Sequence, residues 1–240
     1  SLILSKISLK KIQTQEHKEH SFKHKFIMKK LIETLHPNNI HCLALNFPGV
    51  SGFSKSDPPL YFVKSRSCFN LSGGYVTKPN IDGRFWTECE LGIIISKDCH
   101  EVDIKDVKEY IKGFVVCGDI TCDNINDYNH HLAFSKSRFG FCPTSSHSKL
   151  IDIDRMENAQ IQTFINGELK QSGNFNDAKY DIRESVSYIS SITKLYKNDL
   201  ILTGTPLGWD NCMLVKGDKV CQSITGLVDL SYEIAETDNG

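Results

Sequence analysis

Residues 86–97, "WTECELGIIISK", place two carboxylates one residue apart, directly before an almost wholly apolar run. In a β-strand, residues i and i+2 point to the same face, so Glu88 and Glu90 are expected side by side. Two like charges at that spacing repel each other unless a cation lies between them or water surrounds them. The segment therefore predicts a divalent metal site on a buried strand or, equally, a solvated sheet edge.

The rest of the chain reads as many short strands with few helices. Strands are expected in 41–47 "HCLALNF", 60–65 "LYFVKS", 114–120 "FVVCGDI", 199–209 "DLILTGTPLGW" and 216–235 "KGDKVCQSITGLVDLSYEIA". Residues 159–173, "AQIQTFINGELKQSG", predict a hairpin that turns at Asn166-Gly167. Apolar residues recur at helical spacing in 101–113, where Gly113 is the expected end, and in 182–195. The pattern indicates a β-dominated α+β fold rather than a doubly wound sheet.

Composition limits the classes of function. Among 240 residues, 40% are hydrophobic and 24% are charged, and the formal net charge is -1. Such a balance is typical of globular proteins and gives no attraction to nucleic acid or an anionic membrane. No apolar stretch approaches the ~18 residues of a transmembrane helix. Nine cysteines without a CxxC pair favour a reduced interior over a disulfide framework or a zinc knuckle. A cytoplasmic location is expected.

The first thirty residues have a separate character. They contain eight lysines and only two acids, Glu16 and Glu19. We therefore divide the chain into a basic N-terminal extension, 1–30, disordered or helical, and a folded domain, 31–240. His17, His20 and His24 would share one helical face and could bind a metal, although a solvated basic arm is the favoured interpretation. If the extension is a transit segment, an organellar matrix replaces the cytoplasm as the expected location.

Further residues match the chemistry of a hard metal ion. Mg²⁺ prefers oxygen ligands and keeps water molecules that a substrate can displace. Asp119 in "FVVCGDI" offers a third carboxylate, and the turn Thr203-Gly204-Thr205-Pro206 can present hydroxyl and N–H groups to an anion. Each motif alone is a weak signal, but their order along the chain is far more specific.

Taken together, "ECELGIIISK", "GFVVCGDIT", "SKSRFGFCPTS", "INGELKQSG", the "TGTP" loop and "KGDKVCQSITGL" make the chain similar to the fumarylacetoacetate hydrolase family. The resemblance covers about 41–235 and is greatest to the acylpyruvase and oxaloacetate decarboxylase branch. It implies a mixed β-roll or β-sandwich-like fold, usually a homodimer, in which 41–85 forms a divergent lid region. It also implies Mg²⁺ or Mn²⁺ held by Glu88, Glu90 and Asp119. Lys136 would be the catalytic lysine, and Thr205, Lys136 and, more weakly, Lys64 would contact the substrate.

The same resemblance implies an activity. The family cleaves a C–C bond in a 2-oxo or 1,3-dicarbonyl acid, by acylpyruvate hydrolysis or oxaloacetate decarboxylation, through a metal-stabilised enolate. The metal acts there as a Lewis acid on the C2 oxygen, and a lysine ammonium stabilises the developing charge. A small 2-oxo acid is the expected partner.

Departures from the family pattern keep three interpretations open. Relatives activate water with a lid His–Glu pair, but the corresponding positions hold Val50 and Phe53. Losing a general base typically costs ~10²–10⁴-fold in rate. Asp123 stands where relatives carry a substrate-binding arginine, and His130 and His131 are candidate replacements, although we favour solvent-facing roles for both histidines. The chain is accordingly a decarboxylase or tautomerase that needs no attacking water, a hydrolase with a rebuilt acid/base, or a metal-binding pseudo-enzyme.

Overall fold

The computed structural model describes residues 36–50, 52–80, 83–123, 132–145 and 152–236. The chain divides into two units, 1–36 and 37–240, and the description below concerns the second. The expectations for the basic extension, including His17, His20 and His24, lie outside the described residues, as do His130 and His131.

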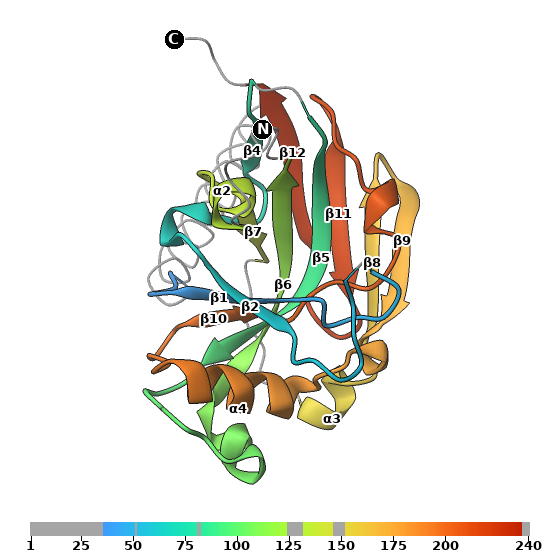
Figure 1. The fold of residues 1–240 in the computed structure, drawn as a ribbon. Coiled ribbons are helices and arrows are strands. Elements are labelled where there is room, and N and C mark those ends of the chain that lie inside the picture. Colours follow the sequence, from blue (N-terminus) through green and yellow to red (C-terminus); the bar gives the residue numbers. More distant parts are fainter. Residues whose placement is uncertain (1–35, 51, 81–82, 124–131, 146–151, 237–240) are drawn as a thin grey trace, which may run out of the picture. The chain divides into compact units, whose positions relative to one another are not determined.

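The second unit is built mainly of strands, as expected (Figure 1). The strands are β1 (Ile40–Ala44), β2 (Leu60–Lys64), β3 (Phe69–Leu71), β4 (Tyr75–Lys78), β5 (Phe85–Ile95), β6 (Ile111–Cys122), β7 (Cys142–Thr144), β8 (Gln160–Ile165), β9 (Glu168–Asn174), β10 (Leu200–Leu202), β11 (Lys219–Ile224) and β12 (Leu230–Glu236). The helices are α2 (Leu132–Lys136), α3 (Ile153–Met156) and α4 (Ile182–Ile192), with 3₁₀ turns η1 (Arg66–Cys68), η2 (Ile104–Tyr110), η3 (Phe175–Asp177) and η4 (Trp209–Asn211).

Two sheets carry the fold. The first has the strand order β2-β1-β10-β5-β6-β7-β3, and the second has the order β4-β12-β11-β8-β9. Figure 1 shows β5 and β6 as the long pair that runs from beside β11 and β12 toward α4. Alternate residues of β5 face opposite ways, and Thr87 faces the second sheet, where its Oγ1 accepts hydrogen bonds from Gln222 and Tyr232 at 3.0 and 2.7 Å. The β-dominated α+β fold is therefore confirmed.

The helices and the hairpin follow their sequence signals closely, with one exception. Asp181 and Glu184 form a reciprocal capping box at the start of α4, whose residues Ile182, Val186 and Ile189 are buried. Asn166 and Gly167 both adopt positive φ between β8 and β9, as a two-residue hairpin turn requires. The helix expected over 101–113 was wrong at both ends: only residues 104–110 are helical, as the 3₁₀ segment η2, and Gly113 lies inside β6, where it pairs with Ile94 of β5.

The cysteines behave as small apolar residues. All nine are free thiols and eight of them are buried, which agrees with the expected reduced interior. Within the described part of the chain, no helix is long and apolar enough to cross a membrane.

Candidate active site

The antiparallel register of β5 and β6 brings the three predicted acids together. Glu88 lies directly opposite Asp119, and Glu90 follows on the same face of β5. One carboxylate oxygen from each residue lies within 4.8 Å of the others. The acids lie inside long strands rather than at strand ends: β5 begins at Phe85, three residues before Glu88, and β6 continues past Asp119 to Cys122.

Two lysine side chains partly neutralise this cluster, each at a different carboxylate oxygen of Asp119. Lys64, at the end of β2, donates to Asp119 Oδ1 and, at 2.7 Å, to the carbonyl oxygen of Phe141. Lys136, at the end of α2, donates to Asp119 Oδ2 at 2.6 Å and to Glu88 Oε2 at 3.1 Å. Both lysines are buried. The structure thus brings both lysines beside the acids, but only Lys136 lines the adjacent cavity; their predicted contact with the substrate stays a prediction.

The charges of these groups hold one another in place. Burial opposes the charged form of Lys136, but Asp119 and Glu88 raise its pKa above the usual value, so it remains an ammonium. Lys64 behaves in the same way beside Asp119. Burial likewise opposes ionisation of Asp119, but the two lysines lower its pKa. Lys136 can therefore act through its positive charge, not as a base.

Glu90 is the acid without an ammonium partner. Its Oε2 accepts one hydrogen bond, 2.6 Å long, from the backbone N–H of Gly204. Burial, together with the nearby carboxylates of Asp119 and Glu88, raises its pKa well above the usual value. Formally, three ionised carboxylates and two ammonium groups would leave the cluster with one negative charge, and the raised pKa makes Glu90 the acid that most readily removes that charge by taking up a proton.

The Thr-Gly-Thr-Pro loop after β10 supports the acids from the other side. Gly204 has φ +88°, and an added Cβ would lie 3.2 Å from both Asn46 Cβ and Leu43 O, so glycine is required for this close approach. Thr205 Oγ1 donates to the carbonyl oxygen of Cys89 and accepts from Gln171 Nε2, both at 2.9 Å. Thr205 therefore lies at the cavity, as expected, with its hydroxyl hydrogen already engaged.

Glu88 is oriented by the aromatic side of the site. Its Oε1 accepts from the indole N–H of Trp86 at 2.8 Å and from Thr121 at 3.4 Å. The rings of Trp86 and Trp209 are 5.4 Å apart, and Trp209 lines the same cavity as the acids. Neither tryptophan was singled out from the sequence. Trp86 could have been, because residues i and i+2 of a strand share a face, and its indole N–H could therefore be expected to donate to Glu88.

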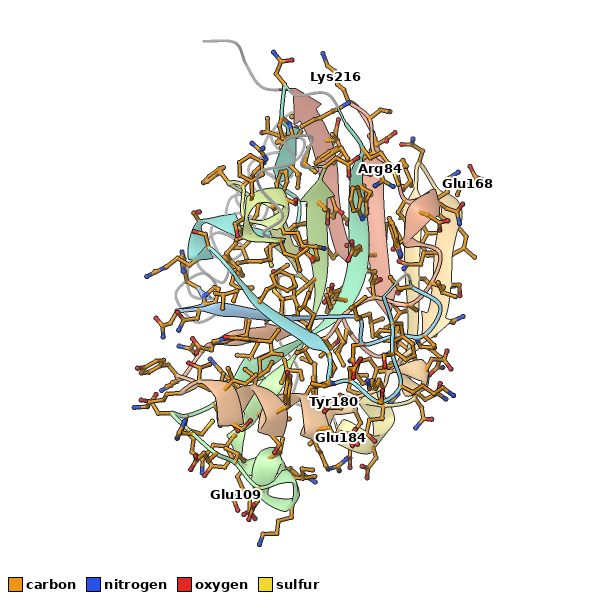
Figure 2. The ribbon with its side chains drawn as sticks, in the orientation of Figure 1. Arg84, Glu109, Glu168, Tyr180, Glu184 and Lys216 are labelled. Carbon is orange, nitrogen blue, oxygen red and sulfur yellow. The ribbon has the colours of Figure 1, made fainter. Side chains whose placement is uncertain are left out.

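The lid segment after β1 is tied down by one asparagine. Asn46 Nδ2 donates to Thr203 O and Tyr180 O, at 2.9 and 3.2 Å, and its Oδ1 accepts from Tyr180 N at 2.8 Å (Figure 2 labels Tyr180). Gly49 then passes so close to Leu207 that an added Cβ would lie 2.5 Å from the Leu207 side chain. This path delivers Val50 to the wall of the cavity.

The two positions that correspond to the expected water-activating pair are both apolar, and they are joined by a backbone hydrogen bond from Phe53 N to Val50 O at 3.0 Å. Val50 lines the cavity, but Phe53 is not among the lining residues. Lys179 Nζ lies 5.6 Å from the centre of the Phe53 ring. No histidine occurs among the described residues that line the cavity.

Asp123 does not present a free negative charge to the site. Arg84, labelled in Figure 2, donates to both of its carboxylate oxygens through Nε at 2.9 Å and a terminal nitrogen at 3.2 Å. This contact lowers the pKa of Asp123. The negative charge of Asp123 is therefore offset by Arg84, a residue that the sequence did not single out.

The three carboxylates fit a hard divalent cation in chemistry. All three donors are oxygen atoms, and together they carry more negative charge than the two lysines neutralise. A divalent ion would convert the formal charge of the cluster from one negative to one positive. Lys136 already shares Glu88 Oε2 and Asp119 Oδ2, so it would lie beside any such ion.

Comparison with known proteins gives consistent matches. Residues 39–235 match the family model described as fumarylacetoacetate (FAA) hydrolase C-terminal. Similar proteins include the mitochondrial oxaloacetate decarboxylase of Dictyostelium discoideum, 32% identical over 73% of this chain and 83% of that protein. The mitochondrial oxaloacetate tautomerase FAHD1 of Homo sapiens is 27% identical over 82% of this chain and 91% of that protein.

Solved structures show the same fold. The 2-hydroxyhepta-2,4-diene-1,7-dioate isomerase from Mycobacterium marinum aligns with a TM-score of 0.78 at 22% identity. The alignment covers 85% of this chain and 77% of that one.

Proposed function

Since this chain belongs to the fumarylacetoacetate hydrolase family, we propose that it is a metal-dependent enzyme that decarboxylates oxaloacetate. The observation that carries the proposal is the buried cluster of Glu88, Glu90, Asp119 and Lys136 on a cavity whose lid position is Val50. In its broader form, the proposal is that the chain carries out the family's chemistry on 2-oxo acids. Several relatives are named as decarboxylases, isomerases or hydrolases, which supports this broader form.

The proposed metal ligands are Glu88, Glu90 and Asp119. A bound Mg²⁺ or Mn²⁺ would supply Lewis-acid polarisation to the 2-oxo group of the substrate. The chain's own residues divide the remaining work. Gly204 N–H fixes the Glu90 carboxylate, and Trp86 with Thr121 fixes Glu88, so the ligand oxygens are oriented before substrate binds.

Lys136 provides positive charge where an enolate oxygen would develop. Its raised pKa keeps it protonated, and it lies beside the acids on the cavity wall. A fixed ammonium in a site of low water content stabilises developing negative charge without reorganisation during the reaction. Thr205 has one lone pair of its hydroxyl left for a substrate hydrogen-bond donor.

A reaction without an attacking water is favoured over hydrolysis. Hydrolysis of an acylpyruvate requires a group that removes a proton from water, and Val50 cannot do so. Loss of carbon dioxide requires no such group. Keto–enol conversion of the same substrate would share the first enolate and is separated from decarboxylation by its products.

The test uses one purified sample with added Mg²⁺ or Mn²⁺, offered oxaloacetate and acetylpyruvate in parallel. We expect pyruvate and carbon dioxide from oxaloacetate above the metal-only rate, and no acetate from acetylpyruvate. Interconversion of enol and keto oxaloacetate without carbon dioxide would assign a tautomerase instead. If calorimetry detects metal binding but neither substrate reacts, the chain is a metal-binding protein without this turnover.

A further inference from the structure

The wall of the cavity is chemically one-sided. The polar part of the lining consists of the three acids, Lys136, Thr205, Gly204 and Asn46. The rest is apolar and consists of Leu43, Ala44, Leu45, Phe47, Val50, Phe62 and Trp209. Both amide hydrogens of Asn46 are already used in holding Tyr180 and Thr203, so its side chain has no donor left for an anion. Lys136 is therefore the one cationic side chain among the described lining residues, so a second anionic group of a ligand would meet an apolar wall.

The cavity is also small. Its volume is about 130 Å³. A cavity of ~150 Å³ accommodates benzene, so the space suits a ligand of about six non-hydrogen atoms. Pyruvate is of this size, whereas the C4 carboxylate of oxaloacetate, or the chain of a longer acylpyruvate, would reach the wall that Val50 and Leu45 form.

On the basis of the proposed function, we propose that Val50 determines both specificity and reaction outcome. The apolar wall that it completes leaves the C4 carboxylate of oxaloacetate without a cation, while Lys136 lies beside the acids that would hold the proposed metal ion. Buried charge without a partner is costly, so the bound dianion gains by moving its charge away from the wall. The same wall admits acetylpyruvate, a monoanion, but provides no base for its hydrolysis.

The step balances in atoms and charge. The C3–C4 bond breaks, carbon dioxide leaves, and the electron pair becomes the C2–C3 double bond of an enolate with its negative charge on the C2 oxygen. The charge thus moves from the apolar wall toward the ammonium of Lys136. A proton from solvent then adds to C3 and yields pyruvate.

Binding of two unreactive anions tests the wall independently of turnover. Lactate and malate are matched at C1 and C2 and differ by the second carboxylate. With the Mn²⁺-loaded protein in calorimetry, we expect malate to bind no more than ~3-fold tighter than lactate, because nothing meets its second charge. Val50→Lys should tighten malate by ~5-fold or more and leave lactate within ~2-fold. Val215→Lys, the same change at a valine that is 60% exposed, should alter neither affinity.

Steady-state kinetics adds a readout that a structural role would not move. Val50→Lys should lower both KM and kcat for oxaloacetate, kcat by ~10-fold, since the new cation stabilises the ground state more than the transition state. In the wild-type protein, acetylpyruvate should inhibit turnover of oxaloacetate competitively without releasing acetate. If Val50→Lys does not fold, Val50→Thr should show the same direction of change in malate affinity, by ~2-fold.

The outcomes separate the two proposals. If wild-type protein binds neither Mn²⁺ nor lactate, the proposed function fails. If it binds both and prefers malate by more than ~10-fold, or if kcat rises in Val50→Lys, the function stands and the role of Val50 is wrong.

Discussion

Two carboxylate-to-amide changes in the acidic cluster should shift stability in opposite directions. Glu90→Gln removes the acid that has no ammonium partner, and the amide oxygen can still accept from Gly204 N–H. Asp119→Asn instead removes the acid that pairs with both Lys64 and Lys136. Both changes add the same formal charge to the cluster, so the pairwise contacts alone decide the sign.

The structure sets the sizes of these effects. Two unit charges 4.8 Å apart, the upper limit within this triad, interact by about 3 kcal/mol at an effective dielectric constant of 20. Attraction from Lys136 offsets part of the repulsion at Glu90, so Glu90→Gln should raise the free energy of unfolding of the metal-free protein by ~2 kcal/mol. Asp119→Asn leaves two buried ammonium groups under-paired and should lower it by ~3–5 kcal/mol.

Thermal unfolding in a chelator at pH 8 measures both changes. For a domain of this size, ~1 kcal/mol shifts Tm by about 2–4 °C, so a rise of ~6 °C for Glu90→Gln and a fall of ~10 °C or more for Asp119→Asn are expected. Glu168→Gln, the same chemical change at an exposed site of β9 (Figure 2), serves as the control and should stay within ~0.5 kcal/mol. Destabilisation by Glu90→Gln, or indifference to Asp119→Asn, would refute the assignment of charges.

Three further outcomes follow from the same geometry. Because the pKa of Glu90 is raised in the folded protein, Glu90 contributes favourably to folding stability at low pH, and this contribution is lost as pH rises through the raised pKa. A carboxylate must lose its proton to bind a metal ion, so Mn²⁺ affinity measured by calorimetry should increase with pH in wild type but not in Glu90→Gln. Val50→His combined with Phe53→Glu should raise acetylpyruvate hydrolysis by ~10-fold or more in an acetate-release assay, and a flat response would mean that this turn does not hold the pair as in relatives. Asn46→Ala removes three hydrogen bonds, two of them to Tyr180, and should cost ~2–3 kcal/mol in chemical denaturation while raising KM; unchanged values for both would rule out its role in fastening the lid.

The sequence predicted the fold class, the hairpin and the acidic residues, because each rests on local periodicity or on a short motif. It could not supply the register that sets Glu88 against Asp119, since pairing between β5 and β6 is decided by packing over the whole strand length. The helix expected up to Gly113 failed for the same reason: helical spacing in residues 101–111 competed with a strand partner far along the chain.

Charge compensation at the site was only partly accessible. The prediction of Lys136 as a site residue depended on the family resemblance, because a lysine in a loop is normally solvated. Arg84 and Asp123 are 39 positions apart, and Asn46 is about 134–157 positions from its partners Tyr180 and Thr203. No local sequence pattern encodes contacts over such separations.

The ammonium groups of Lys64 and Lys136 act as internal counterions for Asp119 and Glu88. The chain can consequently fold in surroundings poor in divalent ions, and the proposed cation would enter a scaffold that is already complete. Removal of that cation by a chelator should then abolish the proposed activity while leaving the architecture intact.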